Sequence, residues 1–178
     1  MYPVVFQHGR VGDMIMLTAL LDLLHRRYGR PCHVVGAGPW NDSVYLGHPD
    51  VARCWTLPRH TPFPSTLAWL GLVRALRRSD PGPIYVAEAM PRQLPRIKRL
   101  LAVSRIDASR CVFIEEAPGK SRHWIDALLR LGQRAPPALS ADYPLPDGWE
   151  RCAPRLQVLA AERVECDAWM RARGWAGR

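Results

Sequence analysis

Short hydrophobic runs alternate with longer stretches of helical periodicity along most of this chain. Residues 3–6 form a β-branched and aromatic run, which predicts a buried strand. After a turn, Leu17, Leu21, Leu24 and Tyr28 fall on one face of a helix that is expected to begin at Asp13. The same patterns then predict strands at 31–36, 51–57, 84–87 and 110–115, and helices at 40–47, 66–78, 92–101 and from 120 onward. Strands separated by helices predict a parallel sheet, so we expect a Rossmann-like α/β sandwich of five to six strands.

The last part of the chain has a different pattern. Residues 134–155 are rich in proline and lack periodicity, which indicates an ordered excursion or a linker. A final helix is predicted from about Arg155 to Arg173, with Leu156, Leu159, Val164 and Trp169 available for packing. We therefore divide the chain into a Rossmann-like domain at 1–154 and a terminal helix with linker at 155–178.

The charge balance is strongly positive for an otherwise ordinary composition. The 178 residues include 25 basic and 16 acidic side chains, which gives a formal net charge of +9. This charge fits either a solvated arginine-rich surface or a polyanionic partner. The same two interpretations apply to the basic face of helix 92–101, which carries Arg92, Arg96 and Arg99 and would be either solvated or a patch for an anion or a membrane surface.

Cysteine usage and hydropathy bear on the compartment. The five cysteines are irregularly spaced and include no C-x-x-C pair, which argues against a disulfide framework or a zinc site and favours a reducing cytosol. No signal peptide is recognisable at the amino terminus. The strongly apolar stretch at 67–73 is far too short to span a bilayer, so any membrane contact is expected to be peripheral.

Asp13 is the residue on which a functional interpretation depends. Gly9 and Gly12 are predicted to bracket a tight turn in which a Cβ atom would crowd the backbone. Asp13 then fits an ordinary helix N-cap, because a carboxylate accepts the orphan N–H groups of a first turn. It also lies just beyond the first strand, at the sheet edge where open α/β sheets bind ligands. There it could remove a proton from a substrate hydroxyl group.

Other candidate residues follow later strands. Glu88 lies at the end of the fourth strand and is a second candidate carboxylate, while Arg59 follows the third strand at the same expected edge. Lys120 and His123 begin the helix after the fifth strand and could face an anionic ligand. Residues 117–121 lack the first glycine of a P-loop. Residues 36–38 lack the rest of a dinucleotide fingerprint, which argues against an NAD-dependent oxidoreductase.

The ordered set of motifs resembles the amino-terminal half of the heptosyltransferases, members of glycosyltransferase family 9. The resemblance rests on GRVGDMIMLTALLDLLHRRYGRPCHVVG, on NDSVYLGHPDVARCWTLPRH, and more weakly on KSRHWIDALLRLG and residues 165–177. Its shared features are a turn ending in Gly-Asp, a leucine-rich helix, and a His-Pro-Asp-Val turn before the third strand.

The resemblance implies a fold, an activity and a set of site residues. The fold would be the acceptor-side half of a GT-B glycosyltransferase, and the nucleotide-sugar would bind mainly to a carboxyl-terminal domain absent from this chain. The reaction would be inverting and independent of a metal or cofactor, with heptose or a related sugar moving from a donor such as ADP-heptose to a lipopolysaccharide-type glycan. Asp13 matches the catalytic base, and Arg10, Gly12, Arg59, Lys120 and His123 would contact the acceptor. The enzyme would be cytoplasmic, at the inner membrane if its acceptor is a glycolipid, and this chain alone would be inactive.

A stand-alone Rossmann-like module that binds an anionic ligand is the alternative. Nucleic acid is disfavoured as that ligand, because no RNA-binding motif is present and the aromatic residues are not interleaved with the basic runs along the sequence.

Overall fold

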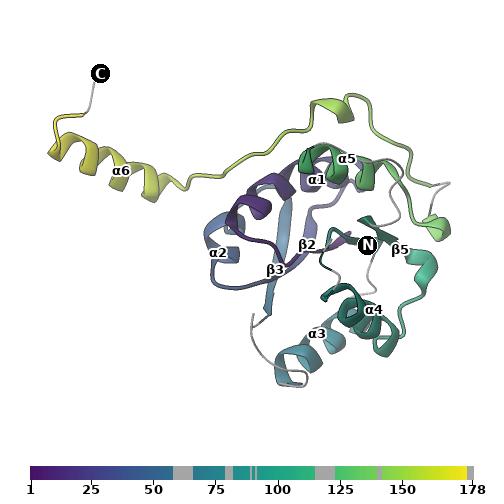
Figure 1. The fold of residues 1–178 in the computed structure, drawn as a ribbon. Helices are drawn as coiled ribbons and strands as arrows, with labels where there is room; N and C mark the ends of the chain where they lie inside the picture. The colour runs from purple at the N-terminus through teal and green to yellow at the C-terminus, as the bar shows by residue number, and fades with distance from the viewer. Residues whose placement is uncertain are drawn as a thin grey trace.

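The first strand of the chain is the central strand of a five-stranded, all-parallel sheet. The computed structural model describes residues 1–57, 66–78, 82–88, 90, 92–114, 123–139 and 142–175. The strand order is β3-β2-β1-β4-β5, so the chain builds outward from β1 to one side and then to the other (Figure 1). The strands are β1 (Val4–Phe6), β2 (Cys32–Ala37), β3 (Val51–Leu57), β4 (Ile84–Val86) and β5 (Cys111–Phe113).

Helices cover both faces of this sheet and make it the middle of three layers (Figure 1). They are α1 (Val11–Tyr28), α2 (Trp40–Tyr45), α3 (Thr66–Arg78), α4 (Leu94–Val103), α5 (Trp124–Gln133) and α6 (Ala160–Ala172). The side chains of a strand alternate between its two faces. Val5 accordingly packs with residues of α1, α2 and α5, whereas Val4 and Phe6 pack with residues of α3 and α4. The predicted Rossmann-like sandwich is therefore confirmed, with five strands among the described residues.

Helix α1 is buried more completely than its amphipathic pattern predicts. The predicted face, which includes Leu17 and Leu24, packs toward the sheet. On another side, Ala19 and Leu23 pack with Cys152 and partly buried residues of the segment before it. Gly132 of α5 allows a close approach of the two helices, because a Cβ atom there would lie 2.5 Å from Leu23 Cδ2.

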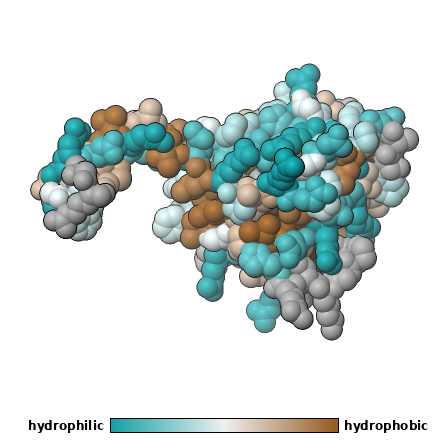
Figure 2. Space-filling model, turned by 90° about the horizontal axis from the view of Figure 1, so that it is seen from above, coloured by the Kyte–Doolittle hydropathy of each residue, from teal (hydrophilic) through white to brown (hydrophobic). Residues whose placement is uncertain are grey.

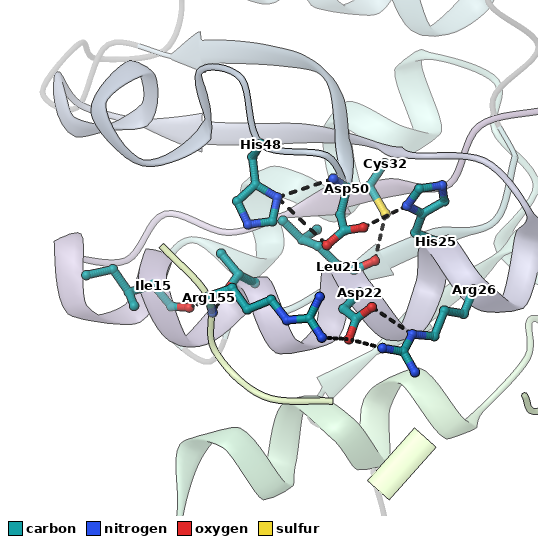
Figure 3. Close-up of polar contacts among 10 residues, drawn as sticks. Ile15, Leu21, Asp22, His25, Arg26, Cys32, His48, Asp50 and Arg155 are labelled. Atoms are coloured by element: carbon teal, nitrogen blue, oxygen red, sulfur yellow. Dashed lines mark hydrogen bonds and ion pairs between the residues drawn. The ribbon is translucent and has the colours of Figure 1, made fainter. Parts of the chain in front are cut away.

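Two polar side chains of α1 hold the segment that follows Cys152. The Thr18 hydroxyl accepts a hydrogen bond from the backbone N–H of Arg155 at 2.7 Å. Asp22 is buried and accepts two hydrogen bonds from the Arg26 guanidinium group, at 2.8 and 2.9 Å. Arg155 approaches the same carboxylate, with Nη2 at 3.7 Å from Asp22 Oδ2, so that Asp22 lies between two arginines (Figure 3).

Beyond this attachment the chain leaves the body of the protein. Helix α6 begins at Ala160, five residues later than predicted, and projects to one side (Figures 1 and 2). Leu156, Val164 and Trp169, which the sequence makes available for packing, are 54%, 65% and 46% exposed, and Trp169 meets the ring of Trp175 at 5.3 Å within the same segment. The periodicity that predicted the helix was real, but an apolar face does not specify what the face contacts. None of the described helices is both long and apolar enough to cross a membrane.

Candidate functional site

The candidate site lies at the carboxyl ends of β1 and β4, where the order of strands reverses. The chain runs from β1 to β2 and β3 on one side of the sheet, and returns to place β4 and β5 on the other. Helices that leave adjacent strands in opposite directions open a crevice at this point, which is where open α/β sheets bind ligands. The residues that follow β1 and β4 therefore have the position expected of a site.

Asp13 lies in the first turn of α1 and not at its N-cap. The helix begins at Val11 after Arg10, whose backbone is extended, so the N-cap interpretation of Asp13 is wrong by three residues. One carboxylate oxygen, Oδ2, accepts a hydrogen bond from the backbone N–H of Arg10 at 2.8 Å. The other oxygen makes no hydrogen bond within the described part of the chain. Asp13 is thus held in place by one oxygen and has the other available for a ligand.

The two glycines of the turn differ in their surroundings. A Cβ atom on Gly9 would lie 2.3 Å from Gln7 Nε2, 2.5 Å from Asp13 Cβ and 2.7 Å from Asp13 Oδ2, so it would be crowded by these side chains and not by the backbone as predicted. The same prediction is wrong for Gly12, which lies inside α1 with no atom within 4 Å of such a position apart from its chain neighbours and the backbone of its own helix. Gly9 therefore brings Gln7 and the carboxylate of Asp13 to one point.

Glu88 lies beside His8. His8 is not among the site residues predicted from the sequence. Oε2 of Glu88 accepts a hydrogen bond from the backbone N–H of His8 at 3.1 Å and lies 3.3 Å from Nδ1 of its ring. Oε1 accepts from the backbone N–H of Met90 at 2.8 Å. The His8 and Glu88 side chains are only 8% and 6% exposed, so the pair is nearly removed from solvent.

These contacts decide the charge state of Glu88. Burial alone would raise the pKa of its carboxyl group, because a charged form is poorly solvated inside a protein. The His8 imidazole and the backbone N–H groups of Met90 and His8 act in the opposite direction and outweigh burial, so the pKa lies below its usual value. Glu88 is therefore a buried carboxylate that stays ionised at neutral pH.

Gln7 supplies an unused acceptor at the same place. It is 3% exposed, and its side-chain oxygen Oε1 has no hydrogen-bond partner within the described part of the chain. Buried polar atoms are nearly always paired in folded proteins, so an orphan oxygen calls for an explanation.

Three of the remaining predicted site residues lie within the described part of the chain, and two do not. Arg10 is exposed immediately before α1, and Gly12 is exposed within its first turn. His123 is the N-cap of α5, where its Nδ1 accepts from the backbone N–H of Ile125 at 3.2 Å, so it lies at the same edge of the sheet as Asp13. Arg59 and Lys120 lie outside the described residues.

Within the described ranges, no three histidine, cysteine, aspartate or glutamate residues form a group that could hold a metal ion. The metal-independent reaction remains a prediction, as does the absence of a cofactor.

Comparison with known proteins supports the fold and gives no family assignment. No protein-family model matches the chain. No curated protein matches it either. Among solved structures, the chain is similar to the glycosyl transferase family 9 from Veillonella parvula, with a TM-score of 0.66 and 14% sequence identity. The alignment covers 99% of this chain and 50% of that one, so the chain spans half the length of the solved structure. At such low identity the likeness shows a shared fold.

Proposed function

We propose that this chain is the acceptor-side domain of an inverting glycosyltransferase, with Asp13 as the general base. The observation that carries the proposal is the Asp13 carboxylate, which is fixed through one oxygen, has no hydrogen bond at the other among the described residues, and follows the carboxyl end of β1 beside that of β4. The structural likeness to half of a family 9 glycosyl transferase supports it. Heptose is the sugar that the sequence resemblance favours, with ADP-heptose as donor and a lipopolysaccharide-type glycan as acceptor.

The chemistry follows from the geometry of the site. An acceptor hydroxyl group becomes nucleophilic as its proton leaves, and the open oxygen of Asp13 would take that proton while the hydroxyl oxygen attacks the anomeric carbon of the donor. The bond from that carbon to the nucleotide diphosphate breaks as the new glycosidic bond forms. Arg10, Arg59, Lys120 and His123 are proposed contacts for an anionic acceptor.

A second domain is proposed to hold the nucleotide part of the donor. In this view the enzyme acts in the cytoplasm, at the surface of the inner membrane when the acceptor is a glycolipid. The alternative is a stand-alone module that binds an anionic ligand. In that case this chain should bind the ligand, and no protein that contains it should transfer a sugar.

The experiment compares Asp13→Asn with the unaltered enzyme in the longest protein that the gene encodes. Transfer of sugar to acceptor should fall by about 10²–10⁴-fold, the usual contribution of a general base, while the acceptor KM changes little. Asp147→Asn removes an exposed carboxylate elsewhere and serves as the control, with activity expected to be unchanged. Near-normal turnover of Asp13→Asn would overturn the assignment of the base.

A further inference from the structure

A row of stacked aromatic rings crosses the sheet on the face covered by α3 and α4. Tyr2, His33 and Trp55 form this aromatic row: the rings of Tyr2 and His33 stack at 4.7 Å, and those of His33 and Trp55 meet edge-on at 5.1 Å. Guanidinium groups end the row on both sides, with Arg30 over the Tyr2 ring at 5.8 Å and Arg53 over the Trp55 ring at 5.1 Å.

Strand register and helix periodicity explain why these residues meet. His33 pairs with Arg53 between β2 and β3, and Trp55 follows Arg53 by two residues, so all three project from one face of the sheet. Arg74 and Arg78 of α3 are four residues apart and therefore lie one turn apart on the same side of that helix. These aromatic residues are far apart in the sequence, but folding places them among arginines. The basic runs of the sequence, which contain no interleaved aromatic residues, do not predict this surface.

A pocket of about 410 Å³ opens between this part of the sheet and α3. Its size suits a ligand between a monosaccharide phosphate and a mononucleotide. Its lining combines a flat aromatic floor, small residues of the helix and three guanidinium groups, and consists of His33, Arg53, Trp55, Gly71, Arg74, Ala75 and Arg78.

Three arginines give the pocket a positive charge. Within the described part of the chain, Arg53, Arg74 and Arg78 form no ion pair or hydrogen bond through their side chains. Burial and then the charge of Arg53 lower the pKa of His33, so its ring is neutral at pH 7 and adds a flat surface. Arginine forks suit phosphate oxygens, and the Trp55 ring, which has Arg53 over one of its faces, gives the pocket an aromatic surface.

From this arrangement we infer that the pocket between β3 and α3 binds a ring-bearing phosphate ester, with Arg53, Arg74 and Arg78 on the phosphate and Trp55 beneath the ring. Nucleotides and sugar phosphates share this chemistry. The inference uses no residue of the candidate site and stands independently of the proposed transferase function. The pocket would hold such a ligand on the sheet face, away from the crevice between β1 and β4.

The test is a binding titration of the whole chain with ADP, glucose 6-phosphate and inorganic phosphate. Binding is measured by calorimetry and by NMR of the His33 ring, whose resonance is assigned with His33→Gln. We expect saturable binding of at least one ester, about tenfold tighter than that of inorganic phosphate because ring stacking adds to the affinity. The bound phosphate should raise the pKa of His33 toward its usual value. The tighter of the two esters identifies the source of the phosphate as a nucleotide or a sugar.

Variants distinguish the pocket from the general positive charge of the protein. Arg74→Gln and Arg78→Gln should each weaken ester binding by about 5- to 10-fold, the loss of one charged hydrogen bond at an exposed site. Arg163→Gln removes the same charge from α6 and should leave the affinity unchanged. Trp55→Leu should abolish the preference for esters over inorganic phosphate. Equal affinity for esters and inorganic phosphate, equal losses in Arg74→Gln and Arg163→Gln, or no saturable binding up to about 10 mM would each overturn the inference.

Discussion

The imidazole of His8 lies 3.3 Å from the carboxylate of Glu88, although 80 residues separate them in sequence. Each residue follows a strand of the central pair, His8 after β1 and Glu88 after β4. Their contact therefore ties together the segments that follow the carboxyl ends of two adjacent strands. The pair is buried beside the turn that carries Asp13, so its integrity should affect both the stability of the fold and the shape of the candidate site.

Glu88→Gln should destabilise the protein in a way that depends on pH. At pH 7 we expect a loss of about 1 to 3 kcal/mol in the free energy of unfolding, because a buried, charged acceptor of hydrogen bonds is replaced. The carboxyl pKa of folded Glu88 lies below the unfolded value of 4.5, so its stabilisation is present above that pH and is lost as the pH falls through the folded pKa. Urea denaturation of both proteins at several pH values measures the difference.

The difference between Glu88→Gln and the unaltered protein should therefore narrow below about pH 4. Glu165→Gln, on the exposed face of α6, is the control and should have little effect at any pH. A difference that stays constant from pH 7 to pH 3 would contradict the role given to the ionised carboxylate.

Alanine substitution of the two turn glycines should have opposite effects. Gly9→Ala places a methyl group against Asp13 Cβ and Gln7, and we expect a loss of about 1 to 3 kcal/mol, typical of overpacking. Gly12→Ala meets no atom within 4 Å and lies in a helix, so it should stabilise the protein by about 0.5 to 1 kcal/mol. Thermal unfolding followed by circular dichroism gives both values, and destabilisation of equal size in the two variants would refute the description of the turn.

The buried carboxylate of Asp22 should contribute more to the stability of the protein than the Arg155 side chain that approaches it. Asp22→Asn weakens a buried carboxylate that receives two hydrogen bonds from Arg26, and we expect a cost of about 1 to 2 kcal/mol. The Arg155 side chain is 56% exposed and 3.7 Å from the carboxylate, so Arg155→Gln should cost less than about 1 kcal/mol. Equal costs in urea denaturation would mean that the more distant pair contributes more than its geometry indicates.

The sequence was informative about elements and less so about their contacts. Runs such as residues 3–6 and 51–57 predicted strands correctly, because β-branched and apolar composition is a local property. The positions of Asp13 and Glu88 at strand ends followed from the same runs. The partnership of His8 with Glu88 depends on β4 lying next to β1, and no local pattern specifies that neighbour.

The N-cap position of Asp13 and the aromatic row were not predicted correctly, because both depend on contacts that residue type alone does not specify. Asp13 was interpreted as an N-cap because its carboxylate suits that role, yet the same carboxylate serves from the third position of the helix by accepting from the backbone of Arg10. No local pattern predicts the aromatic row, because Tyr2, His33 and Trp55 come from separate segments that only the register of the sheet aligns.

The central position of β1 has a consequence for how the chain acquires its structure during synthesis. Val4 pairs with His33 on one side and with Ile84 on the other, so the second neighbour of β1 emerges 80 residues after it. At ribosomal rates this interval is roughly 4 to 16 seconds. In the last part of it, after β3 has been completed at Leu57, a nascent half-sheet of β1, β2 and β3 would present β1 as an unpaired edge, the kind of surface to which other chains add. The central strand of the folded sheet is thus an unpaired edge strand, open to association with other chains, while the protein is being synthesised.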